Sequence, residues 1–387
     1  MSRSMTTEDI LFALLRSEIC GEPVSQEVKV AITQETLKAL WEVSNRHGVP
    51  HIAGQALSKE GLLKQDEVSQ KFQKKTMDAV SVYIHMSHVF HSVCQALEAA
   101  QISFIPLKGM ELQRWYPEPW LRQCSDIDIL VQEENVEAAA RVLEEKLGCT
   151  RSKNGTHDIS FVFTGGVSIE LHFMLIEETV SEKQQALLCR IWEVARPIAG
   201  NNYRYAMPWK WFLLYHLSHM AKHITRGDCP IKLFADLVII DRMPEAEPAE
   251  KDLLLEEAGL AKFYAMVQDV VNYWFFQVPA DAVCKSICDF VLGGPDMKFV
   301  VRRTKKGGRL RYVIHRIFKP YTSLKAMYPV LEKHKWMYPL CQIHRWLRIL
   351  TGKKQRAQTM REIKGIDAAS PEEIEQISFV LKQLELQ

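Results

Sequence analysis

Ser125-Asp126-Ile127-Asp128-Ile129-Leu130-Val131 is the stretch that decides the fold. Polar and apolar residues alternate at its start, which is typical of a β-strand with one buried face. Because side chains two apart in a strand share a face, Asp126 and Asp128 point the same way. Two adjacent carboxylates repel each other, and a bound divalent cation offsets that repulsion. The pair predicts a site for Mg²⁺ (or Mn²⁺), which binds carboxylates, waters and substrate phosphates; the pattern alone would also fit a solvent-facing strand edge.

A second signal lies before the acidic strand. Residues 102–107 form a short apolar run that Lys108-Gly109 follows directly, which predicts a strand ending in a tight turn. Residues 110–115 can begin a helix after that turn. A glycine there lets backbone N–H groups approach a phosphate, and the lysine adds a mobile cation.

A third carboxylate lies downstream. An amphipathic helix is predicted over residues 133–147, and strands over 157–163 and 167–173 with a hairpin turn at Gly165-Gly166. Glu170 lies in the last strand, between apolar neighbours. Three carboxylates from two strands can hold two metal ions about 3.5–4 Å apart, the geometry for in-line phosphoryl or nucleotidyl displacement.

Helical periodicity dominates on both sides of this small mixed sheet. The clearest helices are predicted over residues 8–17, 26–45, 70–100, 209–225, 231–241, 260–276 and 280–292, with a last one after Ser370-Pro371 and Glu373. We therefore predict an α+β protein with three parts: a helical region over 1–100, a catalytic core over 101–177 and a helical region over 178–387.

Composition places the chain among ordinary globular proteins. It has 387 residues, of which 47% are hydrophobic and 25% charged. No apolar run approaches the roughly 20 residues that span a bilayer, and Met1 to Glu8 has no signal-peptide pattern. The nine cysteines are scattered without paired metal-ligand spacing. We expect reduced thiols and a cytoplasmic protein without a membrane span.

Charge is distributed unevenly. Residues 298–364 hold 19 Lys and Arg against two acidic residues, a net +17, which leaves −15 for the rest of a chain whose total is +2. The densest basic run covers residues 302–311. Such a segment predicts an anionic partner, or it neutralises the acidic body across an internal interface. No known RNA-binding signature accompanies it.

Three histidines, His216, His219 and His223, fall on one face of a predicted helix. They could form a metal or phosphate site. The interpretation that we favour is a polar helix face packed against the catalytic core. No Glu completes a His-Glu-x-x-His pattern, so a zinc protease is unsupported.

These residues together carry a family resemblance. The chain resembles the DNA polymerase beta-like nucleotidyltransferase superfamily and, more narrowly, the uncharacterised bacterial nucleotidyltransferase family with a Leu-Lys-Gly turn and a helical C-terminal part. The resemblance covers roughly residues 100 to 350. The residues that carry it are Lys108-Gly109, Arg122, Ser125-Asp126-Ile127-Asp128, Glu170-Leu171-His172, His216, His219, Asp236, Met327-Tyr328-Pro329, Tyr338-Pro339 and Arg345.

The resemblance implies a reaction and roles. A nucleoside monophosphate would pass from an NTP to a hydroxyl acceptor, with release of pyrophosphate. Asp126 and Asp128 would bind both magnesium ions. Glu170 would bind the catalytic ion and accept the proton of the attacking hydroxyl. Lys108 and Gly109 would cradle the triphosphate.

Further substrate contacts are expected from Arg122, Ser125 and His172. Arg122 either touches a phosphate or pairs with an acidic surface residue. His172 either orients Glu170 or contacts substrate, or it is an ordinary hydrogen-bonded strand histidine. Many superfamily members have Gly-Ser in the turn, whereas here Met110 follows the glycine. The acceptor stays open between a protein, a small molecule and an RNA end, and the alternative function is an inactive module that binds nucleotide or a partner protein.

Overall fold

The computed structural model describes residues 5–175, 181–244, 246, 248–293, 297, 301, 318–321, 324, 328, 330–351 and 370–386. The chain divides into two compact units. The first combines Met1–Lys222 with Pro230–Cys284, and the second combines His223–Cys229 with Lys285–Gln387. The residues predicted for the nucleotidyltransferase site all lie in the first unit, whereas His223 of the histidine face lies in the second.

A five-stranded sheet forms the centre of the first unit. Its strands are β1 (Phe104–Pro106), β2 (Asp126–Val131), β3 (Thr150–Asn154), β4 (Asp158–Val162) and β5 (Ser168–His172). Their order across the sheet is β1-β2-β5-β4-β3, with β2 and β5 parallel and the other pairs antiparallel. This mixed sheet between helical regions confirms the predicted α+β fold. The strand β3 was not predicted, because its sequence is polar throughout and it lies largely exposed at the edge.

The turn between β4 and β5 lies at the glycine pair, as the sequence predicted. Gly165 and Gly166 have φ angles of 95° and 88°, a backbone region that residues with a Cβ rarely adopt. The amide of Phe163 donates to the carbonyl oxygen of Val167 at 2.8 Å and closes the turn. The hairpin thereby fixes which residues of β4 and β5 lie opposite each other.

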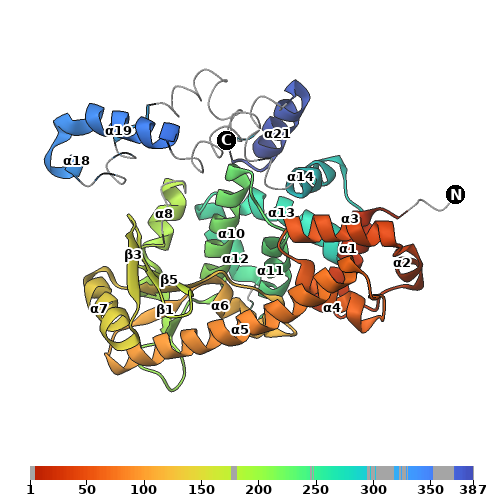
Figure 1. The fold of residues 1–387 in the computed structure, drawn as a ribbon, viewed down its shortest axis with the longest axis horizontal. Coiled ribbons are helices and arrows are strands. Elements are labelled where there is room, and N and C mark those ends of the chain that lie inside the picture. The colour runs from red at the N-terminus through yellow and green to blue at the C-terminus, as the bar shows by residue number, and fades with distance from the viewer. Residues whose placement is uncertain are drawn as a thin grey trace. The chain divides into compact units, whose positions relative to one another are not determined.

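One face of the sheet packs against two helices, α5 (Glu67–Ala99) and α7 (Val136–Leu147) (Figure 1). The core between them holds Ile127 and Ile129 from β2 with Ile169 from β5, all fully buried. Because strand side chains alternate, this packing leaves the carboxylates of β2 and β5 on the opposite face. The helix α7 ends at Gly148 with φ 65°, as a C-terminal glycine predicts.

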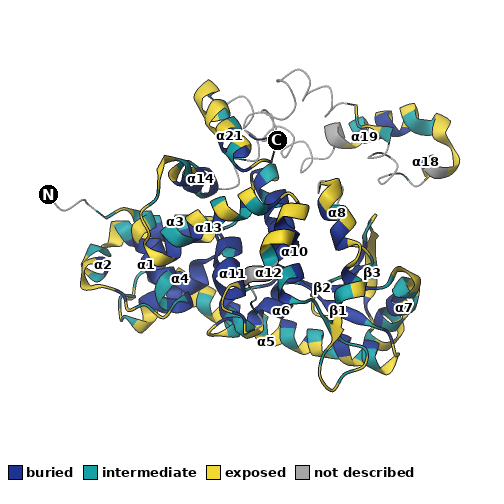
Figure 2. Cartoon of the chain, turned by 180° about the vertical axis from the view of Figure 1, so that it is seen from behind, coloured by how far each residue is buried: buried dark blue, intermediate teal, exposed yellow. Residues whose placement is uncertain are grey.

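The N-terminal helices are α1 (Thr7–Ile19), α2 (Gln26–Ala31), α3 (Gln34–Arg46) and α4 (Pro50–Lys59). The single helix predicted over 26–45 is wrong, because Thr33 interrupts it and caps α3 by accepting from the amide of Thr36. The helix α4 was not predicted, and most of its residues are buried (Figure 2).

Helices also follow the sheet along the chain. They include α10 (Trp209–Arg226), α11 (Lys232–Ile240) and α13 (Ala261–Phe276), which confirm three predicted helices. Shorter elements accompany them: α6 (Lys108–Leu112), α8 (Glu182–Leu188), α9 (Ile191–Val194), β6 (Arg196–Pro197), β7 (Tyr205–Ala206) and α12 (Pro248–Glu257). Within the described ranges, no helix has both the length and the apolar character needed to cross a bilayer.

The later part of the chain contains α14 (Ala282–Leu292), α18 (Val330–Lys333), α19 (Tyr338–Thr351) and α21 (Pro371–Gln383). Ser370 and Glu373 form the predicted reciprocal capping box at the start of α21. The basic run 302–311 lies outside the described residues, as do Met327 and Pro329 of the resemblance. Both interpretations of the basic segment therefore remain predictions.

Candidate functional site

The parallel register of β2 and β5 brings three candidate residues together. Asp128 lies opposite Glu170, and His172 lies two residues further on the same face of β5. One ligand atom from each of these three side chains falls within 4.8 Å of the other two. The sequence predicted that carboxylates from two separate strands would lie together. The position of His172 close to both Asp128 and Glu170 depends on the register between β2 and β5.

Asp128 is the most highly connected member of the cluster. Its Oδ1 accepts a hydrogen bond from Lys108 Nζ at 3.0 Å and lies 2.8 Å from His172 Nε2. Only 3% of Asp128 is exposed, and burial by itself would raise its pKa. The Lys108 ammonium and the His172 hydrogen bond outweigh burial and hold the pKa of Asp128 well below its usual range. Asp128 is therefore a carboxylate that stays ionised despite its burial.

Lys108 reaches Asp128 from the turn after β1. It is the first residue of α6 and has φ 47°, a left-handed conformation that a residue with a side chain adopts at a cost of about 1–3 kcal/mol. Burial opposes its charge, but Tyr215 and Asp128 raise the pKa of Lys108 above its ordinary value. The residue with the strained backbone, Lys108, is thus also the one whose ammonium lies against Asp128.

Asp126 and Glu170 are the more open carboxylates. Burial and the neighbouring Asp128 raise the pKa of Asp126, which accepts a hydrogen bond from Ser125 Oγ at 3.2 Å. The Glu170 side chain is 32% exposed, and its Oε2 lies 3.5 Å from His172 Nε2. Hydrogen bonds to Asp128 and Glu170 raise the pKa of His172 against the opposing effect of burial. Solvent, or a substrate hydroxyl, can therefore approach Glu170 and Asp126 but not the buried Asp128.

The donor set fits a divalent ion. Asp128 and Glu170 supply oxygen ligands, which Mg²⁺ and Mn²⁺ prefer, and Asp126 lies beside them on the same strand face. His172 Nε2 is shared between two carboxylates, an arrangement that suits orientation of the ligands. A softer metal would use the histidine nitrogen directly.

Gly109 and Arg122 have packing roles. A Cβ built on Gly109 would collide with Cys124 Sγ, so close approach of two segments accounts for the glycine. Arg122 forms a two-pronged ion pair with buried Asp236, with distances of 2.7 Å and 2.9 Å, and donates to the carbonyl oxygen of Gln123. Arg122 thus pairs with a carboxylate, as one interpretation predicted, but that carboxylate is fully buried.

The histidines of α10 separate into different environments. His216 Nε2 lies 2.9 Å from the carbonyl oxygen of Leu233, whereas His223 Nδ1 lies 2.8 Å from Asp228 Oδ1. His219 lines a small cavity with Lys108 and His172. Among the described residues, these histidines do not come together as ligands of one ion.

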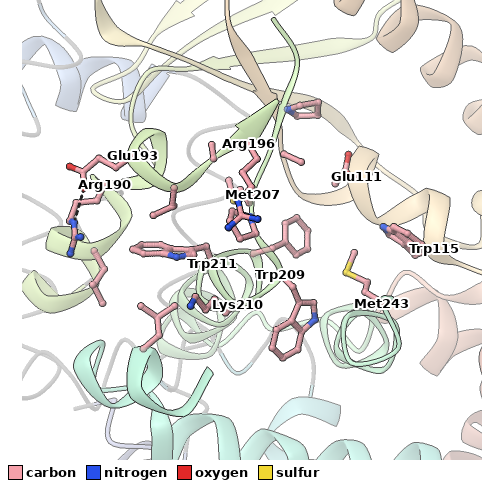
Figure 3. A pocket seen from close by; sticks show the side chains of 18 of the residues that line it. Glu111, Trp115, Arg190, Glu193, Arg196, Met207, Trp209, Lys210, Trp211 and Met243 are labelled. Carbon is pink, nitrogen blue, oxygen red and sulfur yellow. Dashed lines mark hydrogen bonds and ion pairs between the residues drawn. The ribbon is translucent and has the colours of Figure 1, made fainter. Parts of the chain in front are cut away.

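Two further cavities lie in the first unit. The larger has a volume of about 1140 Å³ and lies around the start of α10, with Trp115, Trp209 and Trp211 on its walls (Figure 3). Arg190 and Glu193 on its wall pair with each other at 3.1 Å. The smaller, about 350 Å³, is lined by Ser125, Lys232 and His51 among others. Sequence reasoning missed Lys232 and His51, because no local motif marks them.

The fold and the site define a class: an α+β protein whose mixed sheet carries an acidic, histidine-supported cluster on one face. The chain belongs to the family described as uncharacterised nucleotidyltransferase, whose model matches residues 33–276. That range includes the sheet, the whole cluster and helices α3 to α13. No curated protein matches the chain, and no solved structure matches it either.

Proposed function

We propose that the chain is a metal-dependent nucleotidyltransferase that moves a nucleoside monophosphate from an NTP to a hydroxyl acceptor and releases pyrophosphate. The observation that carries this proposal is the register that pairs Asp128 with Glu170 beside Asp126, in a member of a nucleotidyltransferase family. We extend the relationship to the DNA polymerase beta-like superfamily through the Leu-Lys-Gly turn. The three-part division at residues 100 and 177 and a cytoplasmic location belong to the same proposal.

The proposed roles follow from position and exposure. Asp126, Asp128 and Glu170 are the ligands for Mg²⁺ (or Mn²⁺), which when bound neutralises phosphate charge and lowers the pKa of an acceptor hydroxyl. Glu170 accepts the proton of that hydroxyl, because it is more exposed than Asp128 and lies on a different strand from the two aspartates. His172 holds Asp128 and Glu170 in place through its shared Nε2.

Residues next to the cluster complete the proposed substrate site. Lys108 supplies positive charge beside Asp128 at the start of α6, and the Lys108-Gly109 turn faces the triphosphate. Ser125 orients Asp126 through its hydroxyl. Arg122 anchors the loop before β2 to α11 through its ion pair with Asp236.

The test uses NTPs labelled at the α-phosphate, with Mg²⁺ and a panel of protein, small-molecule and RNA acceptors. Wild-type protein should transfer the label, and Asp128→Asn should abolish transfer because the substitution removes charge but keeps shape. Glu145→Gln, an exposed carboxylate change on α7, is the matched control and should leave transfer intact. Full activity of Asp128→Asn with an unchanged melting temperature would refute the proposal. Nucleotide binding by wild-type protein without any transfer would instead identify an inactive binding module.

A further inference from the structure

The cavity of about 350 Å³ beside the start of β2 is built from three separate parts of the chain. The α3–α4 junction contributes Arg46 and His51, the loop before β2 contributes Ser125, and the start of α11 contributes Lys232. Its volume is at the lower end of the range of about 300–1,000 Å³ for ligand pockets. Residues from all three predicted parts of the chain, the N-terminal helical region, the core and the C-terminal region, therefore line this cavity.

The charge of this cavity is strongly one-sided. Its lining includes Arg46, Arg122 and Lys232, and no Asp or Glu is among the lining residues. Asp236 compensates Arg122, but among the described residues Lys232 makes no hydrogen bond or ion pair. A poorly solvated ammonium with no direct ion pair is costly, so the cavity complements an anion.

Lys232 also lies close to the candidate active site. Burial and Arg122 lower the pKa of Lys232, whereas Asp236, Cys124 and Asp126 act in the opposite direction. Ser125 lines the cavity and donates to Asp126, so the cavity adjoins the carboxylate that begins the proposed metal site.

His51 adds an unfilled hydrogen-bonding position. Its Nε2 lies 2.8 Å from the carbonyl oxygen of Leu121, and only 2% of the residue is exposed. Its buried Nδ1 has no partner among the described residues. Because Nε2 faces an acceptor, Nε2 carries the hydrogen of the neutral ring and Nδ1 is an acceptor. A water or an O–H group of a ligand would satisfy it.

We propose that this cavity is the subsite for the phosphate tail of the donor NTP, with Lys232 as the cation that binds the β- and γ-phosphates. The larger cavity of Figure 3 has a lining of mixed charge, in which Arg114 pairs with Glu111 and Arg190 pairs with Glu193. Because these charges are already neutralised within the wall, that cavity is less suited to a polyphosphate. In the proposed reaction, the bond between the α-phosphorus and the bridging oxygen breaks, and the β- and γ-phosphates leave as pyrophosphate. This inference rests on the proposed function, and Lys232 and Arg46 offset the charge of that leaving group.

The experiment measures the binding of inorganic pyrophosphate by isothermal titration calorimetry in the presence of Mg²⁺. Lys232→Met should weaken binding by about tenfold or more, because a charge-assisted hydrogen bond is lost. Lys232→Arg should restore most of the affinity. Lys74→Met removes a lysine from an exposed position on α5 and should change nothing. Binding of a nucleoside monophosphate, which has no tail, should also be unaffected by Lys232→Met.

A second variant protects the test against misfolding. Arg46 is exposed, so Arg46→Met should keep the fold and weaken pyrophosphate binding several-fold, in line with a more solvated charge. Pyrophosphate and NTP should compete for wild-type protein. Simultaneous binding of both would overturn the inference, because the cavity would then belong to an anionic acceptor or to a free anion.

The inference and the proposed function can fail separately. Unchanged pyrophosphate affinity in both Lys232→Met and Arg46→Met, with active nucleotidyl transfer, removes the subsite and leaves the function. Lys232-dependent, NTP-competitive pyrophosphate binding without any transfer keeps the subsite and removes the function.

Discussion

Asp128 connects the two elements that surround the candidate site, because its Oδ1 meets both Lys108 of the β1–α6 turn and His172 of β5. Two side chains from separate segments of the chain, Lys108 and His172, therefore balance the charge at this one oxygen. Glu170 shares His172 but is far more exposed. This difference in exposure is the basis of the proposed division of roles, in which Asp128 is a metal ligand and Glu170 accepts the proton of the acceptor hydroxyl.

Glu170→Gln should reduce turnover by about 10²-fold or more, within the range for loss of a general base. The binding of NTP should change little, because shape and hydrogen-bonding capacity are kept. His172→Ala should cost less, since His172 only orients its neighbours. Single-turnover kinetics with saturating NTP would separate the two effects. A larger loss in His172→Ala than in Glu170→Gln would contradict these roles.

At the scale of elements, the β4–β5 hairpin pairs β4 with the strand that carries Glu170 and His172. A Cβ at position 166 would meet open space, but the φ angle there is 88°, so only backbone conformation disfavours a side chain. Gly166→Ala should lower the free energy of unfolding by about 1–2 kcal/mol, the cost of a left-handed residue. Urea denaturation would measure it.

Gly166→Asn is the control for that substitution, because asparagine tolerates the left-handed region better than alanine. Its loss of stability should be the smaller of the two. Equal losses would show that the turn geometry differs from the one described.

Elements were predictable where periodicity was clear, as for β2, β5, α10 and α13. The strand β3 carries no alternating pattern and is largely exposed, so it has no local signature. For the site, the carboxylates were visible as strand residues with apolar neighbours. The Lys232 cavity was not, because it is assembled from α3, α11 and the loop before β2 through tertiary packing alone.

At the scale of the whole molecule, the Arg122–Asp236 pair links the loop before β2 to α11 across 114 positions of sequence. Both side chains are almost fully buried, and Tyr116 donates to the same carboxylate at 2.7 Å. Asp236→Asn should lower the free energy of unfolding by about 3–5 kcal/mol, because it leaves the Arg122 charge uncompensated. Chemical denaturation checks this value.

Arg122→Met combined with Asp236→Asn provides the comparison. The double variant should be more stable than Asp236→Asn alone, since it buries no unpaired charge. If the double variant lost the sum of the two single effects, the pair would not be coupled.

The basic segment 298–364 makes a prediction that rests on sequence alone. Reversal of Lys305, Lys306 and Arg309 to Glu should weaken acceptor binding, and wild-type binding should itself fall with added salt. A loss of stability without a change in acceptor binding would support neutralisation of the acidic body instead. If neither acceptor binding nor stability changed, both interpretations would be excluded.

The most direct test of nucleotidyl transfer by this protein follows two phosphates of one NTP. Parallel reactions contain NTP labelled at the α- or at the γ-phosphate, with Mg²⁺ and the acceptor panel. We predict that the α label appears on the acceptor and the γ label in pyrophosphate, and that Asp126→Asn and Asp128→Asn each abolish both products. Transfer of the γ label to the acceptor, or undiminished transfer of the α label by both variants, would contradict nucleotidyl transfer at this cluster.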